Sequence, residues 1–281
     1  MDFVDTQSST VVFGFDSAWT DAPKAPGAIC AVAFDQRGQV QFYEPRLVSF
    51  AEALAYIKEL RKDFVVSLVA LDQPTVVPNA SGGRPVDKVA ASLVSFVGGG
   101  AQMANRSKVG MFCDDSPIWS FISGLDATED PIQARTASSG HFLIEVFPAL
   151  ALPALDERFA QRLRAPKYNP QNRKKFRLED WQAVARAVKR SAEWFNVPGL
   201  AEWADHMRNV AQPRKSDQDK LDAAICVLIG LYWRTGPIAH SAMLGDVDQG
   251  YMVTPISDET WPRLREAAIR RGVPTSQVAD P

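Results

Sequence analysis

Histidine and cysteine are scarce in this chain, and neither occurs in a pattern that carries chemistry. Of 281 residues, three are cysteine and three are histidine. The cysteines form no CxxC pair and have no histidine spaced for zinc, so buried, reduced thiols are expected. His141, His206 and His240 have no motif partner, and no GxSxG sequence occurs. We therefore set aside zinc sites and serine, cysteine or histidine nucleophiles.

Long apolar runs and a strong charge of one sign are also missing. No stretch approaches the roughly 18 to 20 apolar residues that cross a membrane, and the acidic N-terminal residues lack a secretion-signal pattern. A net charge of -2 gives no global attraction for nucleic acid, so any such contact needs a local patch. We expect a cytoplasmic protein with no membrane partner. The oligomeric state is left open, a homodimer included.

The first 72 residues predict three strands, a helix and a fourth strand. Val11–Asp16, Gly27–Phe34 and Gln39–Tyr43 predict an antiparallel meander. Ser49 caps a helix with apolar residues at helical spacing, and Val65–Leu71 is the fourth strand. This order resembles the start of the ribonuclease H fold, in which the fourth strand lies parallel beside the first. The resemblance implies that Asp16 and Asp72, at the ends of those two strands, are neighbours.

The remaining elements complete one domain over residues 8–255, followed by a C-terminal helix and tail over residues 256–281. Residues 73–140 form a glycine-rich loop and helix insertion that favours a mobile lid or a substrate-contacting loop over a tolerated surface insertion. We expect helices over Asp87–Phe96 and Ser116–Leu125, loop over Thr128–Ser139, a fifth strand over Phe142–Phe147, helices over Ala149–Leu163, from Phe176, over Leu200–Val210 and over Asp217–Trp233, and an edge strand at Tyr251–Val253.

Carboxylates mark three of these strands and the start of the last long helix. Asp16 and Asp72 end their strands, and Glu145 lies in the fifth. Asp219 and Asp222 are three residues apart, which puts both on one face of a helix. Such a cluster can hold two divalent ions about 4 Å apart, and phosphodiester hydrolysis needs little else. Mg²⁺ and Mn²⁺ favour these hard oxygen ligands.

Each acid also has a structural interpretation. Asp16 and Asp72 can begin turns, and Glu145 can be an ion-paired edge residue. Ser216 with Asp219 can be an N-terminal capping arrangement. The joint hypothesis gains weight because all of these acids lie where one fold would gather them.

Basic residues concentrate between residues 161 and 190. This segment contains ten Lys or Arg residues and only two acidic residues, so its local net charge is +8. A solvated face explains such a pattern, and a phosphate-contacting surface is the alternative. Candidate substrate contacts are Lys167, Tyr168 and Arg173 in this segment, and Arg84 in the insertion.

A wider resemblance is carried by six motifs: Gly14–Trp19, Ala70–Pro74, Gly83–Asp87, Ile144–Pro148, Asp219–Ala224 and Gly250–Pro255. In order and context they are similar to those of domain-of-unknown-function family 429, a family predicted to be ribonuclease H-like nucleases, over about residues 11–255. The last acidic helix is also similar to that of RuvC-type Holliday-junction resolvases. The resemblance implies an α/β fold with a ribonuclease H-like mixed five-stranded sheet, three antiparallel strands and then parallel strands, flanked by helices.

The same resemblance implies that Asp16, Asp72, Asp219 and Asp222 are metal ligands and that Glu145 is a second-tier ligand or base. Asp72 departs from the resolvases, which use glutamate at this place; the shorter side chain needs a closer strand or a bridging water. We expect a Mg²⁺- or Mn²⁺-dependent phosphodiester hydrolase, a nuclease acting on DNA or RNA. The alternatives are an actin-like ATPase or phosphotransferase, a hydrolase of small phosphorylated molecules, and a non-catalytic nucleic-acid-binding protein.

Overall fold

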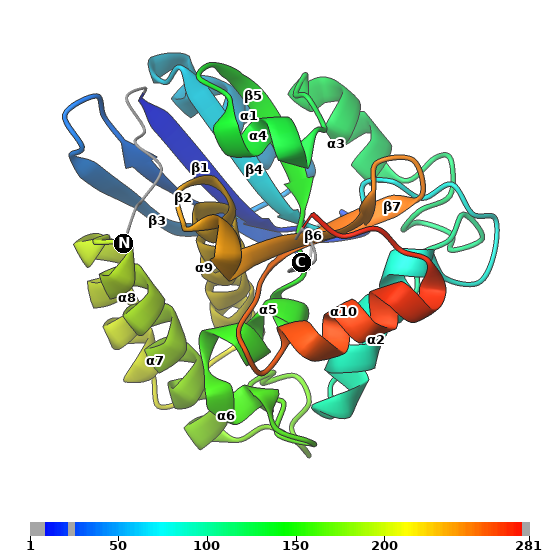
Figure 1. Ribbon diagram of the computed structural model, residues 1–281. Coiled ribbons are helices and arrows are strands. Elements are labelled where there is room, and N and C mark those ends of the chain that lie inside the picture. The colour runs from blue at the N-terminus through cyan, green and yellow to red at the C-terminus, as the bar shows by residue number, and fades with distance from the viewer. Residues whose placement is uncertain (1–8, 22–25, 277–281) are drawn as a thin grey trace.

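A computed structural model describes residues 9–21 and 26–276, arranged around a five-stranded sheet of order β3-β2-β1-β4-β5 (Figure 1). The predicted domain start at residue 8 and the polar end of the tail lie outside these residues. β1, β2 and β3 are antiparallel, whereas β4 and β5 run parallel to β1. The strands span Thr10–Asp16, Gly27–Phe34, Val40–Val48, Val66–Asp72 and Gly140–Glu145. The predicted α/β class and mixed sheet are therefore confirmed.

The central strand is buried on both faces, which explains its unbroken apolar run. Val11, Phe13 and Phe15 pack against α1 (Phe50–Leu60) and α3 (Pro117–Leu125). Val12 packs in the opposite cluster, which contains α9 (Lys215–Arg234). Because side chains alternate along a strand, Asp16 ends β1 on the α9 side.

Helices cover both faces of the sheet (Figure 1). The predicted Ser49 cap is confirmed: the Ser49 hydroxyl accepts a hydrogen bond from the Glu52 N–H, and the Glu52 carboxylate accepts one from the Ser49 N–H. The short helix η1 (Arg61–Asp63) follows α1. The cluster on the α9 side also draws on α5 (Pro148–Leu155), α6 (Glu157–Ala160), α7 (Leu178–Trp194) and α8 (Pro198–Arg208).

Two elements were not predicted. α4 (Pro131–Thr136) occupies a stretch expected to be loop, and its start signal was present: Asp130 caps the Gln133 N–H at 2.9 Å and Pro131 takes the first position. The expected edge strand at Tyr251–Val253 is β7 (Gly250–Pro255), which pairs with the unforeseen β6 (Ser241–Asp246) after η2 (Ile238–His240). The two strands form a separate hairpin.

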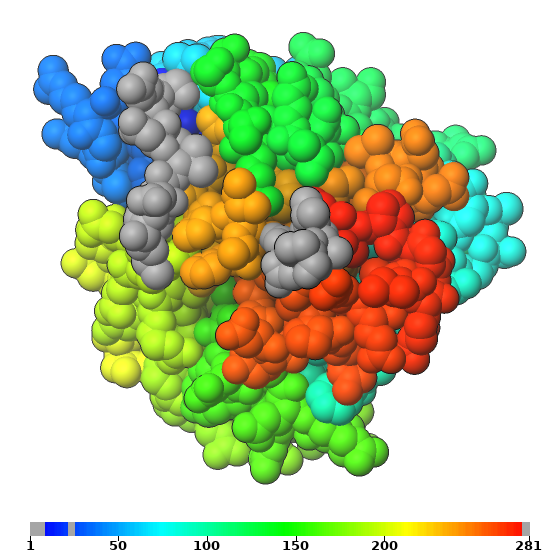
Figure 2. Space-filling model, viewed as in Figure 1, coloured from blue at the N-terminus to red at the C-terminus, as the bar shows by residue number. Residues whose placement is uncertain are grey.

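The C-terminal helix closes the molecule on one side. α10 (Trp261–Arg271) packs against α2 (Pro85–Phe96), the helix of the insertion, and the two share an apolar cluster with β6 and β7. Figure 2 shows α10 in red beside the orange hairpin on one face of the molecule. Among the described residues, no helix has the length and apolar character to cross a membrane.

Gly14 sets how closely α9 approaches the sheet. A Cβ atom at this position would lie 2.2 Å from the Ala223 carbonyl oxygen and 2.3 Å from the Val227 nitrogen. Both are backbone atoms, so relief requires α9 itself to move. We expect Gly14→Ala to lower the free energy of unfolding by about 3 kcal/mol, at the upper end of ordinary overpacking.

Gly100→Ala is the matched control, because a Cβ atom there meets nothing within 4 Å. It should change the free energy of unfolding by less than about 0.5 kcal/mol. Urea denaturation of both variants checks the prediction. Equal, small effects at the two positions would contradict the close approach of α9.

Candidate active site

Four aspartates lie at one end of the sheet. In the parallel pairing of β1 with β4, Asp16 lies directly opposite Asp72. Both strands end there, and Leu68 and Ala70 pack on the α9 side, so Asp72 has the same strand parity as Asp16. The expected neighbourhood of the two acids is confirmed.

α9 supplies the other two acids from its first turns. The helix begins at Lys215, and Asp217 accepts a hydrogen bond from the Arg214 N–H at 2.7 Å. The capping interpretation of Ser216 with Asp219 is therefore wrong, because the side chain of Asp217 makes the capping hydrogen bond. Asp219 is left facing the site, where it lines a groove together with Asp16.

Asp222 is buried, and each of its carboxylate oxygens accepts one hydrogen bond. The Tyr168 hydroxyl donates to its Oδ1 at 2.7 Å, and the Gln218 amide donates to its Oδ2 at 2.9 Å. Tyr168 was predicted to contact a substrate phosphate; in the structure it holds a carboxylate of the cluster instead. It comes from the loop before α7 and ties that loop to α9.

Lys215 is a member of the site that the sequence analysis missed. Its ammonium group forms an ion pair with Asp219, four residues further along α9, and its side chain is 39% exposed. The i, i+4 spacing of a lysine and an aspartate was the available signal. The lysine partly offsets four negative charges that would otherwise lie together unbalanced.

Burial raises the pKa of every acid in the cluster, and repulsion between the acids adds to the rise for Asp16, Asp72 and Asp222. Burial raises the pKa of Asp16 most, and the charges of Asp222 and Asp72 raise it further. Asp72 follows the same pattern, and burial also raises the pKa of Asp219. Burial raises the pKa of Asp222 to about 6, although Tyr168 and Lys215 oppose the shift. The cluster therefore stores unfavourable negative charge, which a bound cation would relieve.

The donor set fits a hard divalent cation. It consists of four carboxylates, and the Oε1 of Gln218 beside them is buried with no hydrogen-bond partner among described residues. Mg²⁺ and Mn²⁺ take such oxygen ligands and retain water molecules that need acceptors. Within the described part of the chain, no three His, Cys, Asp or Glu side chains are already gathered tightly enough to hold an ion.

Glu145 lies apart from the four aspartates and forms a buried ion pair. Arg84 donates to both of its carboxylate oxygens, at 2.7 and 2.5 Å, and also pairs with Asp87 at 2.8 Å. The side chains of Arg84 and Glu145 are 0% and 1% exposed. The ion-paired interpretation of Glu145 is thus correct, and the prediction of a phosphate contact at Arg84 is wrong. Strand parity explains the separation, because Glu145 is in register with Leu71 rather than Asp72.

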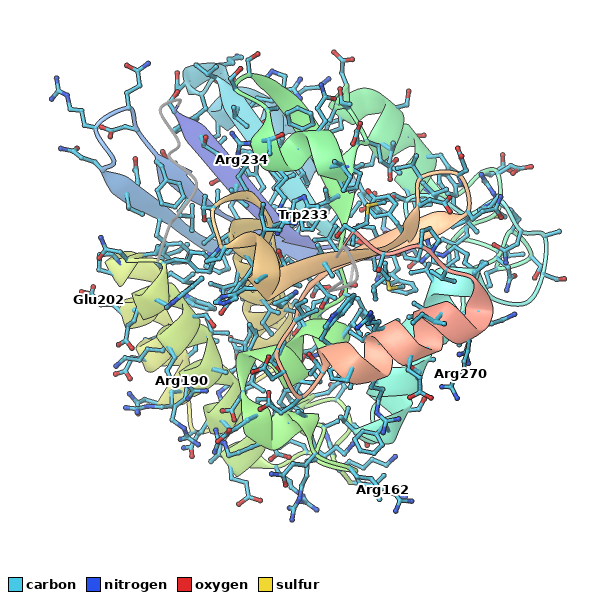
Figure 3. All side chains as sticks on the ribbon, viewed as in Figure 1. Arg162, Arg190, Glu202, Trp233, Arg234 and Arg270 are labelled. Carbon is cyan, nitrogen blue, oxygen red and sulfur yellow. The ribbon has the colours of Figure 1, made fainter. Side chains whose placement is uncertain are left out.

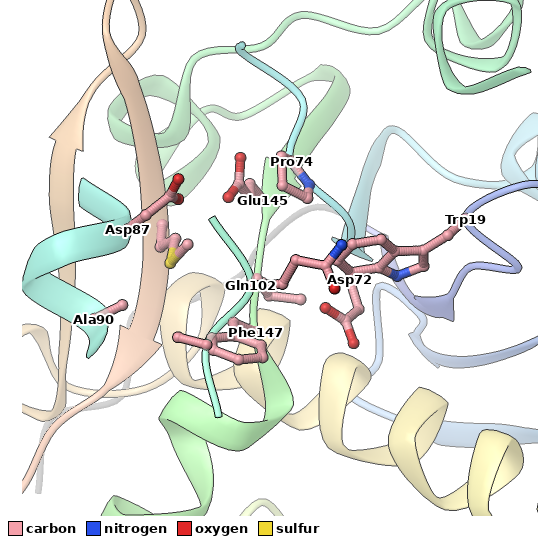
Figure 4. Close-up of a pocket in the computed structure, with 11 residues that line it drawn as sticks. Trp19, Asp72, Pro74, Asp87, Ala90, Gln102, Glu145 and Phe147 are labelled. Atoms are coloured by element: carbon pink, nitrogen blue, oxygen red, sulfur yellow. The ribbon is translucent and has the colours of Figure 1, made fainter. Parts of the chain in front are cut away.

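A small cavity of about 30 Å³ lies between this ion pair and Asp72. Figure 4 shows Trp19 beside Asp72, with Asp87 on the far side of the cavity. Burial raises the pKa of Glu145 to about 7, and Arg84 opposes that rise. The cavity has the volume of a water molecule or two and no room for substrate.

The basic segment contributes few groups to the site itself. The Lys167 ammonium donates to the Gly98 carbonyl at 2.7 Å, which fixes the loop rather than leaving a cation for substrate. Arg173 is exposed, as predicted for a phosphate contact, which stays a prediction. Figure 3 shows Arg162 and Arg190 on the outer surface, away from the sheet. Arg190 is paired with Asp156 at 2.7 Å.

The fold and the site define an α/β protein with a carboxylate cluster at one end of a mixed sheet. The chain belongs to the family described as protein of unknown function (DUF429), whose model matches residues 14–243. No match was found among curated proteins or among solved structures. The family match confirms the resemblance to this family over five of the six motifs; Gly250–Pro255 lies beyond the matched residues, and the activity is left to be proposed from the site.

Proposed function

We propose that this protein is a metal-dependent phosphodiester hydrolase of ribonuclease H-like architecture, and that it acts as a nuclease. One observation carries the proposal: Asp16 and Asp72 end adjacent parallel strands in register, and α9 presents Asp219 and Asp222 to the same end. The strand order and the helix across β1 support the ribonuclease H-like assignment. The raised pKa values support a site built for cations rather than for an ion-paired core.

Asp16, Asp72, Asp219 and Asp222 would hold Mg²⁺ or Mn²⁺. Bound divalent ions would supply Lewis-acid chemistry, lowering the pKa of water and neutralising phosphate charge. Other residues of the chain orient the ligands and adjust the charge of the site. Tyr168 and Gln218 hold the Asp222 carboxylate in place, Lys215 brings one positive charge to the groove, and burial of Asp16 and Asp222 keeps bulk water from weakening the field.

The test is a pair of measurements on the wild-type protein. Mn²⁺ and Mg²⁺ are titrated by calorimetry, and cleavage of labelled single-stranded DNA, duplex DNA and RNA is followed in the same buffers, with EDTA as control. We expect metal binding and metal-dependent cleavage of at least one substrate. ATP and a small phosphodiester are assayed in parallel. Metal binding with turnover only of those compounds would replace the nuclease assignment, and absence of metal binding would overturn the proposal.

A further inference from the structure

A groove of about 490 Å³ opens beside the aspartate cluster. Asp16 and Asp219 of the cluster line it together with Trp19, Gln171 and Lys215. Its volume falls in the range of sites for small organic ligands. It holds more than ions and water, and it is far too small for a stacked double helix. A single nucleotide unit therefore fits within it.

Among the described residues that line this groove, Trp19 is the one aromatic side chain, and it is held in an unusual backbone conformation. Its φ angle is 45°, in the left-handed region that residues other than glycine rarely adopt. Its ring packs on Phe112, with ring centroids 5.6 Å apart, and the Gln73 amide donates to its carbonyl at 3.5 Å. Gln73 is itself buried and accepts from the Ser17 hydroxyl at 2.6 Å. Strained backbone held by its surroundings concentrates at functional sites.

The indole therefore has a fixed place next to the reacting groups. Trp19 lines both the groove and the small cavity beside Asp72, and Figure 4 shows it next to Asp72. A flat aromatic side chain beside a phosphate-processing centre is suited to stack on a nucleobase, and stacking tolerates every base. A base inside a duplex has both faces covered and cannot use it.

Positive charge continues from the groove along the neighbouring loop. Gln171 lines the groove, and the residues that follow it include four exposed cations: Arg173, Lys174, Lys175 and Arg177. Within the groove, Lys215 supplies a further positive charge. The chain as a whole carries -2, so these exposed cations give a local positive charge that attracts phosphates.

We infer that the substrate is single-stranded nucleic acid, with one unpaired base against Trp19 and the adjoining phosphates running over Arg173–Arg177. The inference rests on the proposed function for the cleavage step, and it adds the substrate class and the residue that selects it. A duplex is disfavoured because the aromatic contact requires a free base face, which a stacked base pair does not offer.

Binding is measured by fluorescence anisotropy with a labelled thymidine oligonucleotide of about 15 nucleotides. A hairpin duplex and an abasic oligonucleotide of equal length are compared, in Ca²⁺ and in EDTA buffers. Base–aromatic stacking predicts that Trp19→Leu weakens binding of the thymidine oligonucleotide about 5- to 150-fold. Trp261→Leu, a partly exposed tryptophan on α10, should leave binding unchanged. The abasic oligonucleotide should bind wild type and Trp19→Leu equally weakly.

Equal binding by Trp19→Leu and Trp261→Leu, or a duplex bound as tightly as the single strand, would overturn the inference. The abasic oligonucleotide tests the need for a base in wild-type protein, so this result does not depend on whether a variant folds. Failure of the proposed function looks different: the single strand binds through Trp19, but no metal binds and nothing is cleaved. A cleavage rate that changes neither with Trp19→Leu nor with removal of the base would support the proposed function and overturn this inference.

Discussion

The Asp16→Asn variant should lose metal-dependent cleavage by more than about 100-fold and should, as metal-free protein, be more stable than wild type. Partners that merely orient metal ligands cost 10- to 100-fold when removed, so a direct ligand is expected at or beyond that range. The gain in stability follows from the cluster, because burial and the charges of Asp222 and Asp72 raise the pKa of Asp16 above its usual value of 3.8. A neutral amide removes that unfavourable charge, and such changes are worth about 0.5–2 kcal/mol.

The sign of the pH dependence checks the cause. Because the pKa of Asp16 is higher in the folded than in the unfolded state, its ionisation destabilises the fold as the pH rises above about 3.8, and the penalty disappears below that value. The stability advantage of Asp16→Asn should therefore be largest near neutral pH and vanish near pH 3. Denaturant titrations at several pH values measure it. Asp248→Asn, at an exposed site in the turn of the β6–β7 hairpin, is the control and should change neither stability nor activity.

Arg84→Met should destabilise the protein by about 3–5 kcal/mol, the usual cost of removing one partner of a buried ion pair. The substitution leaves the Glu145 and Asp87 carboxylates buried without their cation. It also frees the Val76 carbonyl, to which Arg84 donates at 2.9 Å. The measurement is the midpoint and slope of urea unfolding.

Two comparisons separate this prediction from a general effect of losing an arginine. Arg270→Met removes a 59% exposed partner of Glu266 on α10 and should cost less than about 1 kcal/mol. Adding Glu145→Gln to Arg84→Met should recover part of the loss, because the uncompensated charge is then gone. Metal binding should survive in Arg84→Met protein that remains folded; its loss would return Glu145 to the list of metal ligands.

The pairing of Asp16 with Asp72 could be read from the sequence because it depends on strand order and on where each apolar run stops. Three short-turned strands, a helix and a fourth strand leave few arrangements, and in this one the ends of β1 and β4 meet. The i, i+3 spacing on α9 is likewise a local property. Periodicity marked the strand ends and the helix face, and the resemblance to the ribonuclease H fold placed the fourth strand beside the first.

The residues that pair with the acids could not be predicted in the same way, because they lie in loops. The sequence of a loop has no periodic pattern that shows where it runs. Arg84 lies 61 positions from Glu145, and Tyr168 lies 54 positions from Asp222. Both were assigned to substrate because a cation or a tyrosine in a loop predicts exposure, whereas tertiary packing buries Arg84 and half-buries Tyr168. Parity along β5 would have placed Glu145 on the opposite side from Asp72, had the register with β4 been known.

The close packing of α9 on the sheet also determines when the fold can be completed during synthesis. Gly14 and Ala223 belong to one contact, yet a ribosome reads more than 200 codons between them. At a translation rate of 5–20 residues per second, at least about ten seconds pass between synthesis of β1 and synthesis of the helix that covers it. Through that interval the growing chain holds Asp16 and Asp72 without Asp219 and Asp222. The four carboxylates of the proposed metal site therefore come together only after the last long helix has been synthesised.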